Sequence, residues 1–313
     1  MEEIITHGGF ADGFTMLLHQ LIGQPGKELE YTPEMSLEER INVKLAGRKE
    51  RFKPTRSNIS LFCDTIGDKN PLHRSDEYAR FLGFEKGRIV PGTQINANLD
   101  QFVEEATSIL NSSLKPRELS FHFAGNTIDF STPIYPGEQI RWQITDYKVE
   151  DGNVTLYIPG ANKRREIIID PVRANLSREY PQSSKIENPK IFTRDFTFRI
   201  TEESLADYKK ATGDNDKSET IPWSYSTALV TSALLEISTG EDGAPTGINR
   251  GMKFQFHKRP TFGDIDISVF LIREPKYLRK INQYKFSFGA LCHQDNNPVL
   301  YGNIDVVSDK KIN

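Results

Sequence analysis

An internal duplication limits the folds that this 313-residue chain can adopt. Gly213-Asp214 repeats Gly67-Asp68 after 146 residues, and each pair follows a segment with helical spacing. A second pattern, Phe256…Pro260…Gly263-Asp264, repeats Phe130…Pro133…Gly137-Glu138 after 126 or 127 residues. Repetition of this kind indicates two similar units that pack on each other. We therefore expect two stacked sheets in one pseudo-dimeric body.

The duplication suggests a division into three parts. Residues 1–49 form an N-terminal extension, 50–180 a first unit and 190–313 a second unit, with the polar, proline-containing stretch 180–189 as linker. In the extension, Ser36-Leu37-Glu38-Glu39 is a capping box that predicts a short helix ending near Gly47. Two interpretations of the extension stay open, a segment packed on the core and a lid over an active site.

Hydrophobic periodicity predicts α+β units, each with one long helix and several antiparallel strands. An apolar stripe at steps of three and four residues indicates a buried helix from Ile95 to Leu110. A shorter helix is expected over 58–65, and Trp223–Ile237 would be the second long helix. Strands are predicted over 118–123, 126–130, 139–149, 153–158 and 166–176, with Asp151-Gly152 as a hairpin turn.

The first unit contains the residues with the clearest chemistry. Gly67-Asp68-Lys69-Asn70-Pro71-Leu72-His73 places a carboxylate and an imidazole five positions apart, on a backbone where Gly67 and Pro71 should block regular structure. Such a pair can do general acid–base work on a water molecule. Pro91-Gly92 then opens the long helix, whose first free N–H could receive a developing oxyanion.

Each of these residues also has a purely structural interpretation. Asp68 could be a turn or helix-cap residue and His73 a surface histidine, although their combination at this spacing favours catalysis. Asn70 could orient Asp68 or simply form an Asx turn before Pro71. Gly92 could serve only the geometry of the helix start. Asp214 is expected to be structural, because the second unit has no Asn-Pro and no His after it.

The motif, with Ala79 six residues after it and the Ile89-Val90-Pro91-Gly92 stretch, resembles the MaoC-like, or hydratase 2, branch of the hot-dog fold. The resemblance implies a double hot-dog, with catalysis in the first unit and a degenerate second unit. It also implies reversible, (R)-specific hydration of trans-2-enoyl thioesters, equivalent in reverse to dehydration of (R)-3-hydroxyacyl thioesters. Asp68 and His73 would activate the water, without a metal or a redox cofactor. The chain departs from the family at Pro91, where a histidine is frequent, and at Asp100, near the place of a small hydroxyl residue.

Two other functions stay open beside this one. A hydratase of branched or dicarboxylic acyl-CoA, of the mesaconyl-CoA type, would have a similar double fold. A non-catalytic subunit that binds acyl thioesters is the alternative outside enzymes, and the intact Asp68/His73 pair argues against it.

A thioester substrate on coenzyme A or acyl carrier protein would bring phosphate groups to the protein. Lys86 and Arg88, beside the motif, are the first candidates to bind them. The basic stretches Lys163-Arg164-Arg165 and Lys258-Arg259 are further candidates, and a solvated basic loop is the plain alternative for each.

Residues 74–91 of the first unit form a segment that should lie over its cleft and carry His73 to its place, and the second unit lacks the equivalent. This shortening should leave room at the interface, kept open by Ser224, Ser226, Thr227 and Ala228 at the start of the second long helix. We therefore expect medium or long acyl chains to be favoured. Decay of a redundant copy is the alternative explanation of the deletion.

Composition narrows the remaining classes of function. A net charge of −3 gives no reason to expect nucleic acid or a membrane as partner, and homodimer formation is left open. His7, His19, His122, His257 and His293 lack ligand spacing, so no metal site is expected. Cys63 and Cys292 make no disulfide framework, and Cys63 is expected to be a buried apolar residue. The start Met1-Glu2-Glu3 lacks the basic region of a signal peptide, and a cytoplasmic location is expected.

Overall fold

The computed structural model describes residues 35–114, 118–164, 166–179, 193–214, 218–238, 247–279 and 282–308. The predicted linker 180–189, Arg165, His7 and His19 lie outside these ranges. Within the described residues, no helix combines the length and apolarity needed to cross a membrane.

The first half of the structure alternates short helices and strands around one long helix. Its elements are α2 (Leu37–Lys44), β1 (Lys49–Phe52), α3 (Arg56–Thr65), α4 (Pro71–Arg74), α5 (Asp76–Phe81), α6 (Gly92–Asn111), β2 (His122–Asp129), β3 (Ile140–Gln143), β4 (Asp146–Glu150), β5 (Asn153–Ala161) and β6 (Ile167–Ser177).

Within the described residues, the second half repeats this order without counterparts of α2, α4 and α5. Its elements are β7 (Thr193–Ile200), α7 (Glu202–Thr212), α8 (Trp223–Ser238), β8 (Gly247–Phe256), β9 (Gly263–Leu271), β10 (Lys276–Leu278), β11 (Gln283–Gln294) and β12 (Asn297–Ser308). The helix pairs α3/α7 and α6/α8 therefore occupy equivalent places in the two halves.

All strands belong to one antiparallel sheet whose order is mirrored about its centre. The order is β1-β3-β5-β6-β2-β8-β12-β11-β9-β7, with β4 added to β5 and β10 to β11. The two halves meet where β2 pairs with β8, at a seam of five residue pairs from Gly125↔Gln255 to Asp129↔Gly251. The prediction of two stacked sheets is wrong in this respect. The edges of β2 and β8 satisfy each other's backbone groups, so the half-sheets join edge to edge.

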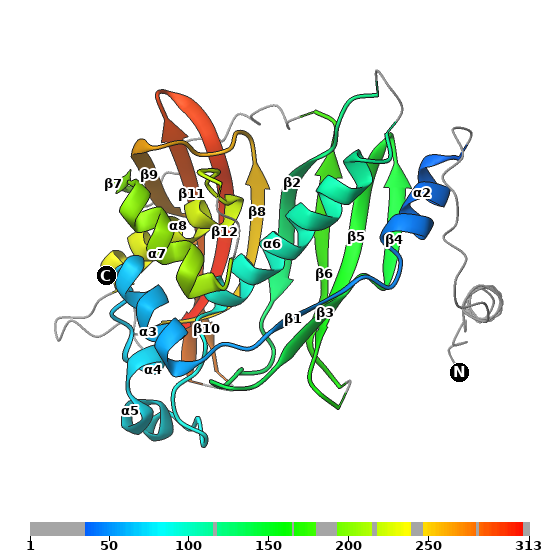
Figure 1. Cartoon of the computed structure of the whole chain (residues 1–313). Helices are drawn as coiled ribbons and strands as arrows, with labels where there is room; N and C mark the ends of the chain where they lie inside the picture. Colours follow the sequence, from blue (N-terminus) through cyan, green and yellow to red (C-terminus); the bar gives the residue numbers. More distant parts are fainter. Residues whose placement is uncertain are drawn as a thin grey trace, which may run out of the picture.

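The central helices α6 and α8 lie side by side against the same face of the curved sheet (Figure 1). The apolar residues of α6 are buried, among them Leu99, Phe102, Val103 and Ala106, which confirms its predicted stripe. A single hydrophobic core runs through both halves, with Trp142 in one and Trp223 in the other. Ile41 and Leu45 are fully buried in it, so the end of the N-terminal extension packs on the core.

The strand boundaries differ from the sequence prediction in two places. Residues 118–121 are not a strand, because Asn111 at the end of α6 holds both backbone groups of Phe121 by hydrogen bonds, and β2 starts at His122. The predicted strand 139–149 is broken into β3 and β4. At the break, the Ile144 amide donates to the Arg48 carbonyl and the Thr145 amide donates to the Tyr157 carbonyl. The capping box at Ser36, the α6 span and the hairpin at Asp151-Gly152 are as predicted.

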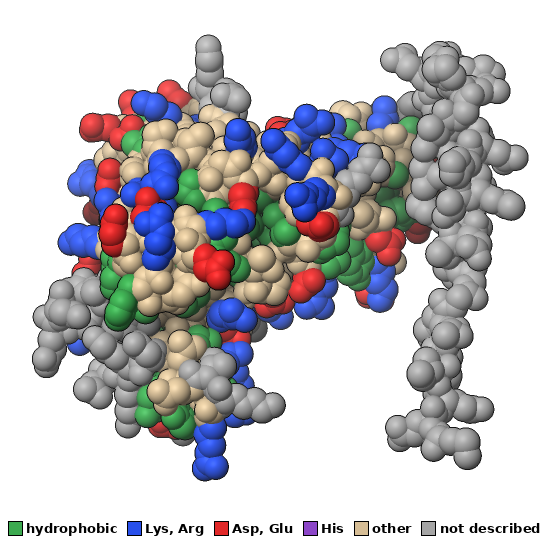
Figure 2. Space-filling model, turned by 90° about the horizontal axis from the view of Figure 1, so that it is seen from below, with side chains coloured by type: hydrophobic (Ala, Val, Ile, Leu, Met, Phe, Trp, Pro, Cys, Tyr) green, Lys and Arg blue, Asp and Glu red, His purple; other side chains and the backbone are tan. Residues whose placement is uncertain are grey.

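The surface seen from below shows basic and acidic side chains interspersed over most of its area (Figure 2). This distribution agrees with the small net charge of −3. No large field of one sign is therefore visible on that face.

The close pairing of β2 with β8 requires a glycine at position 125, the first residue of the seam, and this requirement can be tested. Gly125 has φ +151°, and a Cβ there would lie 2.2 Å from the carbonyl oxygen of Phe254 across the seam. We expect Gly125→Ala to lower the free energy of unfolding by roughly 2–5 kcal/mol, through overlap and backbone strain together.

Gly137→Ala is the matched control, because Gly137 also has a positive φ of +84° but no atom within 4 Å of the added Cβ. Gly137→Ala should lower the free energy of unfolding by about 1–2 kcal/mol, through backbone strain alone. Urea unfolding measures both variants, and equal losses would contradict a tight seam.

Candidate active site

The end of α3 places the carboxylate of Asp68. Gly67 takes the left-handed conformation with φ +70°, which ends the helix, and the Asp68 amide then donates back to the carbonyl of Cys63 at 2.7 Å. Arg74 donates from Nε to the Asp68 carbonyl at 2.8 Å and forms an ion pair with Asp64. The Asp68 backbone is therefore held on both sides while its side chain, 2% exposed, points inward.

Asp68 and His73 lie close together, as the motif predicts. Asp68 Oδ2 and His73 Nε2 are 3.9 Å apart, and the His73 side chain is 12% exposed. That separation is too long for a direct hydrogen bond, and it lets one water oxygen sit at about 2.8 Å from both atoms. The pair is thus spaced to hold a water between a carboxylate and an imidazole.

The backbone fixes the tautomer of His73. Its Nδ1 lies 2.9 Å from the carbonyl oxygen of Ile89. A carbonyl can only accept, so Nδ1 donates its hydrogen, and in the neutral ring Nε2 carries the lone pair. That lone pair lies on the side of Asp68, where it can accept a proton.

Asn70 orders the loop between the two residues. Its backbone N–H donates to Asp68 Oδ1 at 2.8 Å, and its side-chain oxygen accepts from the backbone N–H of Leu72 at 3.0 Å. The second contact makes Asn70 the cap of α4, with Pro71 at the first helical position. The expectation that Pro71 blocks helix is therefore wrong, because a helix starts readily with proline there. Asn70 thus both caps the helix and fixes one carboxylate oxygen.

Gly92 is the first residue of α6, next to the loop of Asp68 and His73. Its N–H has no hydrogen-bond partner within the described residues, as expected at a helix start. A Cβ on Gly92 would lie 2.9 Å from the Phe130 ring, so a glycine is also needed for packing. Both interpretations of Gly92, donor and small residue, fit this geometry.

Residues 74–91 cover the site and bring His73 to it. Leu72, Ala79 and Ile89 form a small apolar cluster that packs against Ile248 of the second half. Asp76 ties the segment down by accepting from Arg56 at 2.6 Å and Arg88 at 3.1 Å, and these hydrogen bonds lower the pKa of its carboxyl.

The predicted phosphate-binding residues are engaged in ion pairs elsewhere. Arg88 bonds Asp76, and Lys86 bonds Glu138 at 2.7 Å and lies over the Tyr135 ring. Arg259 bonds Glu104 and stacks on Trp223. None of these residues, nor Lys163, Arg164 or Lys258, is among those lining the cavity beside Asp68. Their phosphate role therefore stays a prediction.

A cavity of about 160 Å³ joins the Asp68/His73 pair to the second half of the chain. One wall comes from the motif and from Pro91, Gly92 and Thr93 at the start of α6. The other wall is mostly apolar and comes from α8, β8, β11 and β12, namely Thr231, Leu234, Leu235, Ile248, Phe288, Ile304 and Val306. The site is therefore built from both halves, on either side of the seam.

The residues predicted to keep this space open are wrong. Thr231, Leu234 and Leu235, in the second half of α8, line the cavity instead of Ser224, Ser226, Thr227 and Ala228. Those four residues are buried, and Ser224 lines a second cavity, beside Asp214, instead. Ser224, Thr227 and Ala228 lie on the same face of α8 as Thr231, Leu234 and Leu235 but one or two turns nearer its start. The sequence shows this face and does not show which of its turns lies beside the motif.

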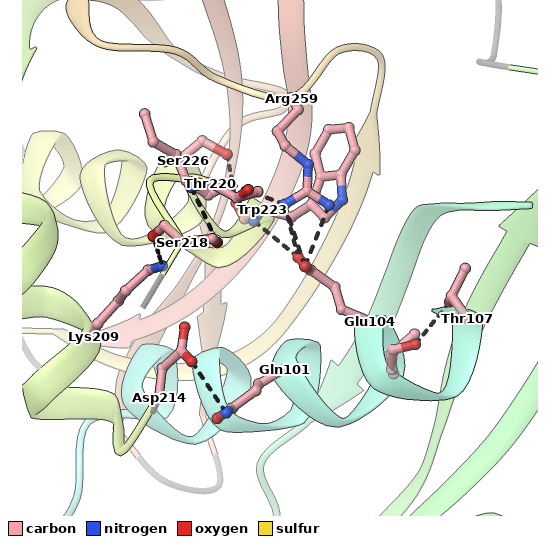
Figure 3. Close-up of polar contacts among 12 residues, drawn as sticks. Gln101, Glu104, Thr107, Lys209, Asp214, Ser218, Thr220, Trp223, Ser226 and Arg259 are labelled. Atoms are coloured by element: carbon pink, nitrogen blue, oxygen red, sulfur yellow. Dashed lines mark hydrogen bonds and ion pairs between the residues drawn. The ribbon is translucent and has the colours of Figure 1, made fainter. Parts of the chain in front are cut away.

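The second half keeps the backbone of the motif but not its chemistry. Gly213 has φ +78° and the Asp214 amide donates to the Lys209 carbonyl at 2.9 Å, as at Gly67-Asp68. Asp214 then accepts from Gln101 of α6 at 3.3 Å (Figure 3). No histidine lines the cavity of about 390 Å³ beside it. Within the described residues, no group of His, Cys, Asp and Glu could hold a metal ion in either half.

Figure 3 also shows a polar cluster that joins the two halves near Asp214. Glu104 of α6 accepts from the Arg259 guanidinium at 3.2 Å and from the Trp223 amide at 3.4 Å. Burial raises the pKa of Glu104, while Arg259 opposes that rise. In the second half, the place of the Asp68/His73 pair is thus taken by contacts that hold α6 against α8.

Neither cysteine is placed for nucleophilic chemistry. Cys63 and Cys292 are fully buried, and burial raises the pKa of both thiols far above the usual range. Cys63 is a small apolar core residue, as predicted.

No protein-family model matches the sequence, and no curated protein matches it either. Among solved structures, a MaoC-like dehydratase is similar with a TM-score of 0.59 and 12% identity, over 88% of this chain and 100% of that one. A MaoC domain dehydratase from Chloroflexus aurantiacus J-10-fl gives 0.61 and 10%, over 91% and 100%. A Mycobacterium tuberculosis protein described as a double hotdog fold gives 0.57 and 7%, over 84% and 96%. The chain has the double hot-dog fold of MaoC-like dehydratases.

Within this double hot-dog, Asp100 of α6 makes a pH-dependent contribution to stability. It is fully buried, and burial, with Glu104 as a smaller cause, raises the pKa of its carboxyl well above the usual range. Asn126 donates to its Oδ1 at 2.8 Å and Asn96 to its Oδ2 at 3.2 Å. The folded protein therefore binds a proton here that the unfolded chain releases near pH 4.

We predict that Asp100→Asn removes this dependence, because the amide has no proton to lose. Stability from the wild-type carboxyl is fully present below about pH 4 and declines as the pH rises towards the folded-state pKa. The Tm of the variant should therefore rise relative to wild type between about pH 4 and pH 8. Thermal unfolding at several pH values measures this difference, and a constant difference would contradict a protonated Asp100.

Proposed function

We propose that the protein hydrates enoyl thioesters and catalyses the reverse dehydration of 3-hydroxyacyl thioesters. The observation that carries this proposal is the 3.9 Å spacing of Asp68 Oδ2 and His73 Nε2 beside the free N–H of Gly92. The shared fold with MaoC-like dehydratases and the GDxNPxH motif support it. By the same resemblance, we propose (R) stereochemistry and a carrier that is coenzyme A or acyl carrier protein.

In the hydration direction, a water held by Asp68 and His73 attacks C3 of the enoyl group. Its proton passes to His73 Nε2, and Asp68 Oδ2 accepts the other O–H and aims the oxygen. The carbon–carbon double bond shifts its electron pair towards the thioester, whose oxygen becomes negative and is stabilised by the Gly92 N–H. The imidazolium then returns the proton to C2, so one water is added overall.

The protein's own contacts prepare these groups before substrate binds. The Ile89 carbonyl holds the Nδ1 tautomer of His73, and the Asn70 amide occupies Asp68 Oδ1, leaving Oδ2 to face the water. Such preorganisation lowers the barrier because no group has to reorient in the reaction.

Asp68→Asn and His73→Gln test the mechanism. Each should leave the fold intact and lower kcat by ~10²–10⁴, the range for loss of a positioned acid or base. The loss of absorbance at the conjugated enoyl thioester measures turnover on a panel of enoyl-CoA and enoyl-acyl carrier protein substrates.

Asp214→Asn is the matched control, because Asp214 has the same backbone setting but no histidine among the described residues that line the cavity beside it. It should keep the wild-type kcat. Near-wild-type turnover of both Asp68→Asn and His73→Gln would show that the mechanism is wrong.

We further propose that medium or long acyl chains are preferred over crotonyl thioester. The support is the apolar wall that α8, β11 and β12 add beyond the reacting groups. Each buried methylene contributes ~0.8 kcal/mol, so kcat/KM should rise with chain length until the cavity is full.

Thr231→Phe tests this preference, because Thr231 is half-buried on the apolar wall. The phenyl ring of the variant should fill space on this wall. It should lower kcat/KM for long chains by about tenfold or more and change crotonyl turnover little. Assays of chains from four to twelve carbons measure this, and an equal effect on all lengths would contradict an acyl-binding wall.

A further inference from the structure

Among the irregularities of the sheet, two β-bulges lie at the same place in the two halves, next to the seam. On β2, Phe123 pairs with Leu176 and Gly125 with Asn175, so Ala124 is the extra residue. On β8, Asn249 pairs with Val306 and Gly251 with Asp305, so the extra residue is Arg250.

The seam shows that Ala124 and Arg250 are equivalent positions. A shift of 126 residues converts the pair Gly125↔Gln255 into Gly251↔Asp129, which is also a pair of the seam. The same shift of 126 residues takes position 124 to position 250, so the bulge on β2 and the bulge on β8 are at equivalent positions. The two halves therefore share the backbone distortion and differ in the residue that it presents.

The two bulge residues have different surroundings. Ala124 is 7% exposed and does not line the cavity of either half. Arg250 is exposed and lines the cavity that holds Asp68 and His73. Its backbone carbonyl accepts from the Phe130 amide at 2.9 Å, so it lies beside the ring that packs on Gly92.

Arg250 is also the one lysine or arginine among the described residues that line this cavity. Within the described chain it has no ion pair, whereas Lys86 and Arg88, in residues 74–91, are both bound to carboxylates. A bulge re-aims a side chain out of the regular alternation of a strand. Here it adds an uncompensated guanidinium to the rim of an otherwise mainly apolar cavity.

We propose that Arg250 binds an anionic group of the substrate and thereby determines which thioesters the site accepts. The inference rests on the proposed function. A guanidinium binds phosphate and carboxylate oxygens through two parallel N–H donors. The anion is either a phosphate of the thioester carrier or a second carboxylate at the end of the acyl chain.

Direct binding tests the assignment without depending on turnover. Calorimetric titration with butyryl-CoA, which has no double bond to hydrate, compares the wild type with Arg250→Gln. If the anion is a phosphate of the carrier, loss of hydrogen bonds to a charged group should weaken butyryl-CoA binding about ten- to a hundredfold, with Arg250→Lys in between. Lys253→Gln is the matched control, since Lys253 is exposed on the same strand and does not line the cavity, and it should bind like wild type.

Two phosphate-free probes separate the sources of the anion. They are the N-acetylcysteamine thioesters of butyric acid and of succinic acid. If Arg250 binds the carrier phosphate, Arg250→Gln weakens butyryl-CoA binding and leaves both cysteamine thioesters unchanged. If it binds an acyl carboxylate, the variant weakens the succinyl thioester and leaves butyryl-CoA unchanged. Either result supports the assignment.

The assignment and the proposed function fail in different ways. Wild-type protein that binds none of the three thioesters contradicts the function and, with it, the role of Arg250. The second failure concerns Arg250 alone. If Arg250→Gln is folded with an unchanged Tm and binds all three probes as tightly as the wild type does, the role of Arg250 is overturned.

Discussion

The antiparallel pairing of β2 with β8 is the contact on which the rest of the molecule depends. It joins the half-sheets into one curved layer and satisfies two edges that would otherwise be open to aggregation. It also sets α6 beside α8, because each helix covers its own half of the same face. The cavity of Asp68 is lined from both sides of this seam, so neither half contains a complete site.

The sequence predicted the parts of this arrangement that follow from local pattern. The motif places Asp68, Asn70, His73 and Gly92 where expected, and the periodicity from Ile95 to Leu110 gives the central helix. The duplicated Gly-Asp and Phe…Pro…Gly patterns correspond to equivalent elements in the two halves. Local spacing suffices here because both signals lie within one loop or one helix.

Properties that depend on how separate elements meet were not predictable in this way. Lys86 and Arg88 form ion pairs with Glu138 and Asp76, partners that are set by tertiary contacts, and their phosphate role stays a prediction. Ala228 does not line the cavity, although it shares a face of α8 with Thr231 and Leu235, because the axial position of the helix decides which of its turns lies beside the motif. Arg250 escaped notice because a bulge exists only in the pairing of two strands, so no single strand shows it.

The buried polar residues of α6 fix the position of this helix, and with it the position of Gly92 at its start. Gln94 donates to the Ala211 carbonyl in the second half, and Asn98 accepts from the Trp142 indole on β3. Asn126 of β2 bonds Asn96 and Asp100 together. An apolar helix can rotate or slide against a sheet at little cost, because hydrophobic contacts have no direction.

Hydrogen bonds in a buried setting do have direction, and breaking one leaves an unsatisfied group. The polar residues of α6 bond to partners on three different elements, so its rotation and its axial position are both fixed. Gly92 begins this helix, 24 residues after Asp68 in the chain, yet its N–H must stay aligned with the Asp68/His73 pair to within a fraction of an ångström. The polar core of α6 thus trades some hydrophobic stability for the placement of a single N–H.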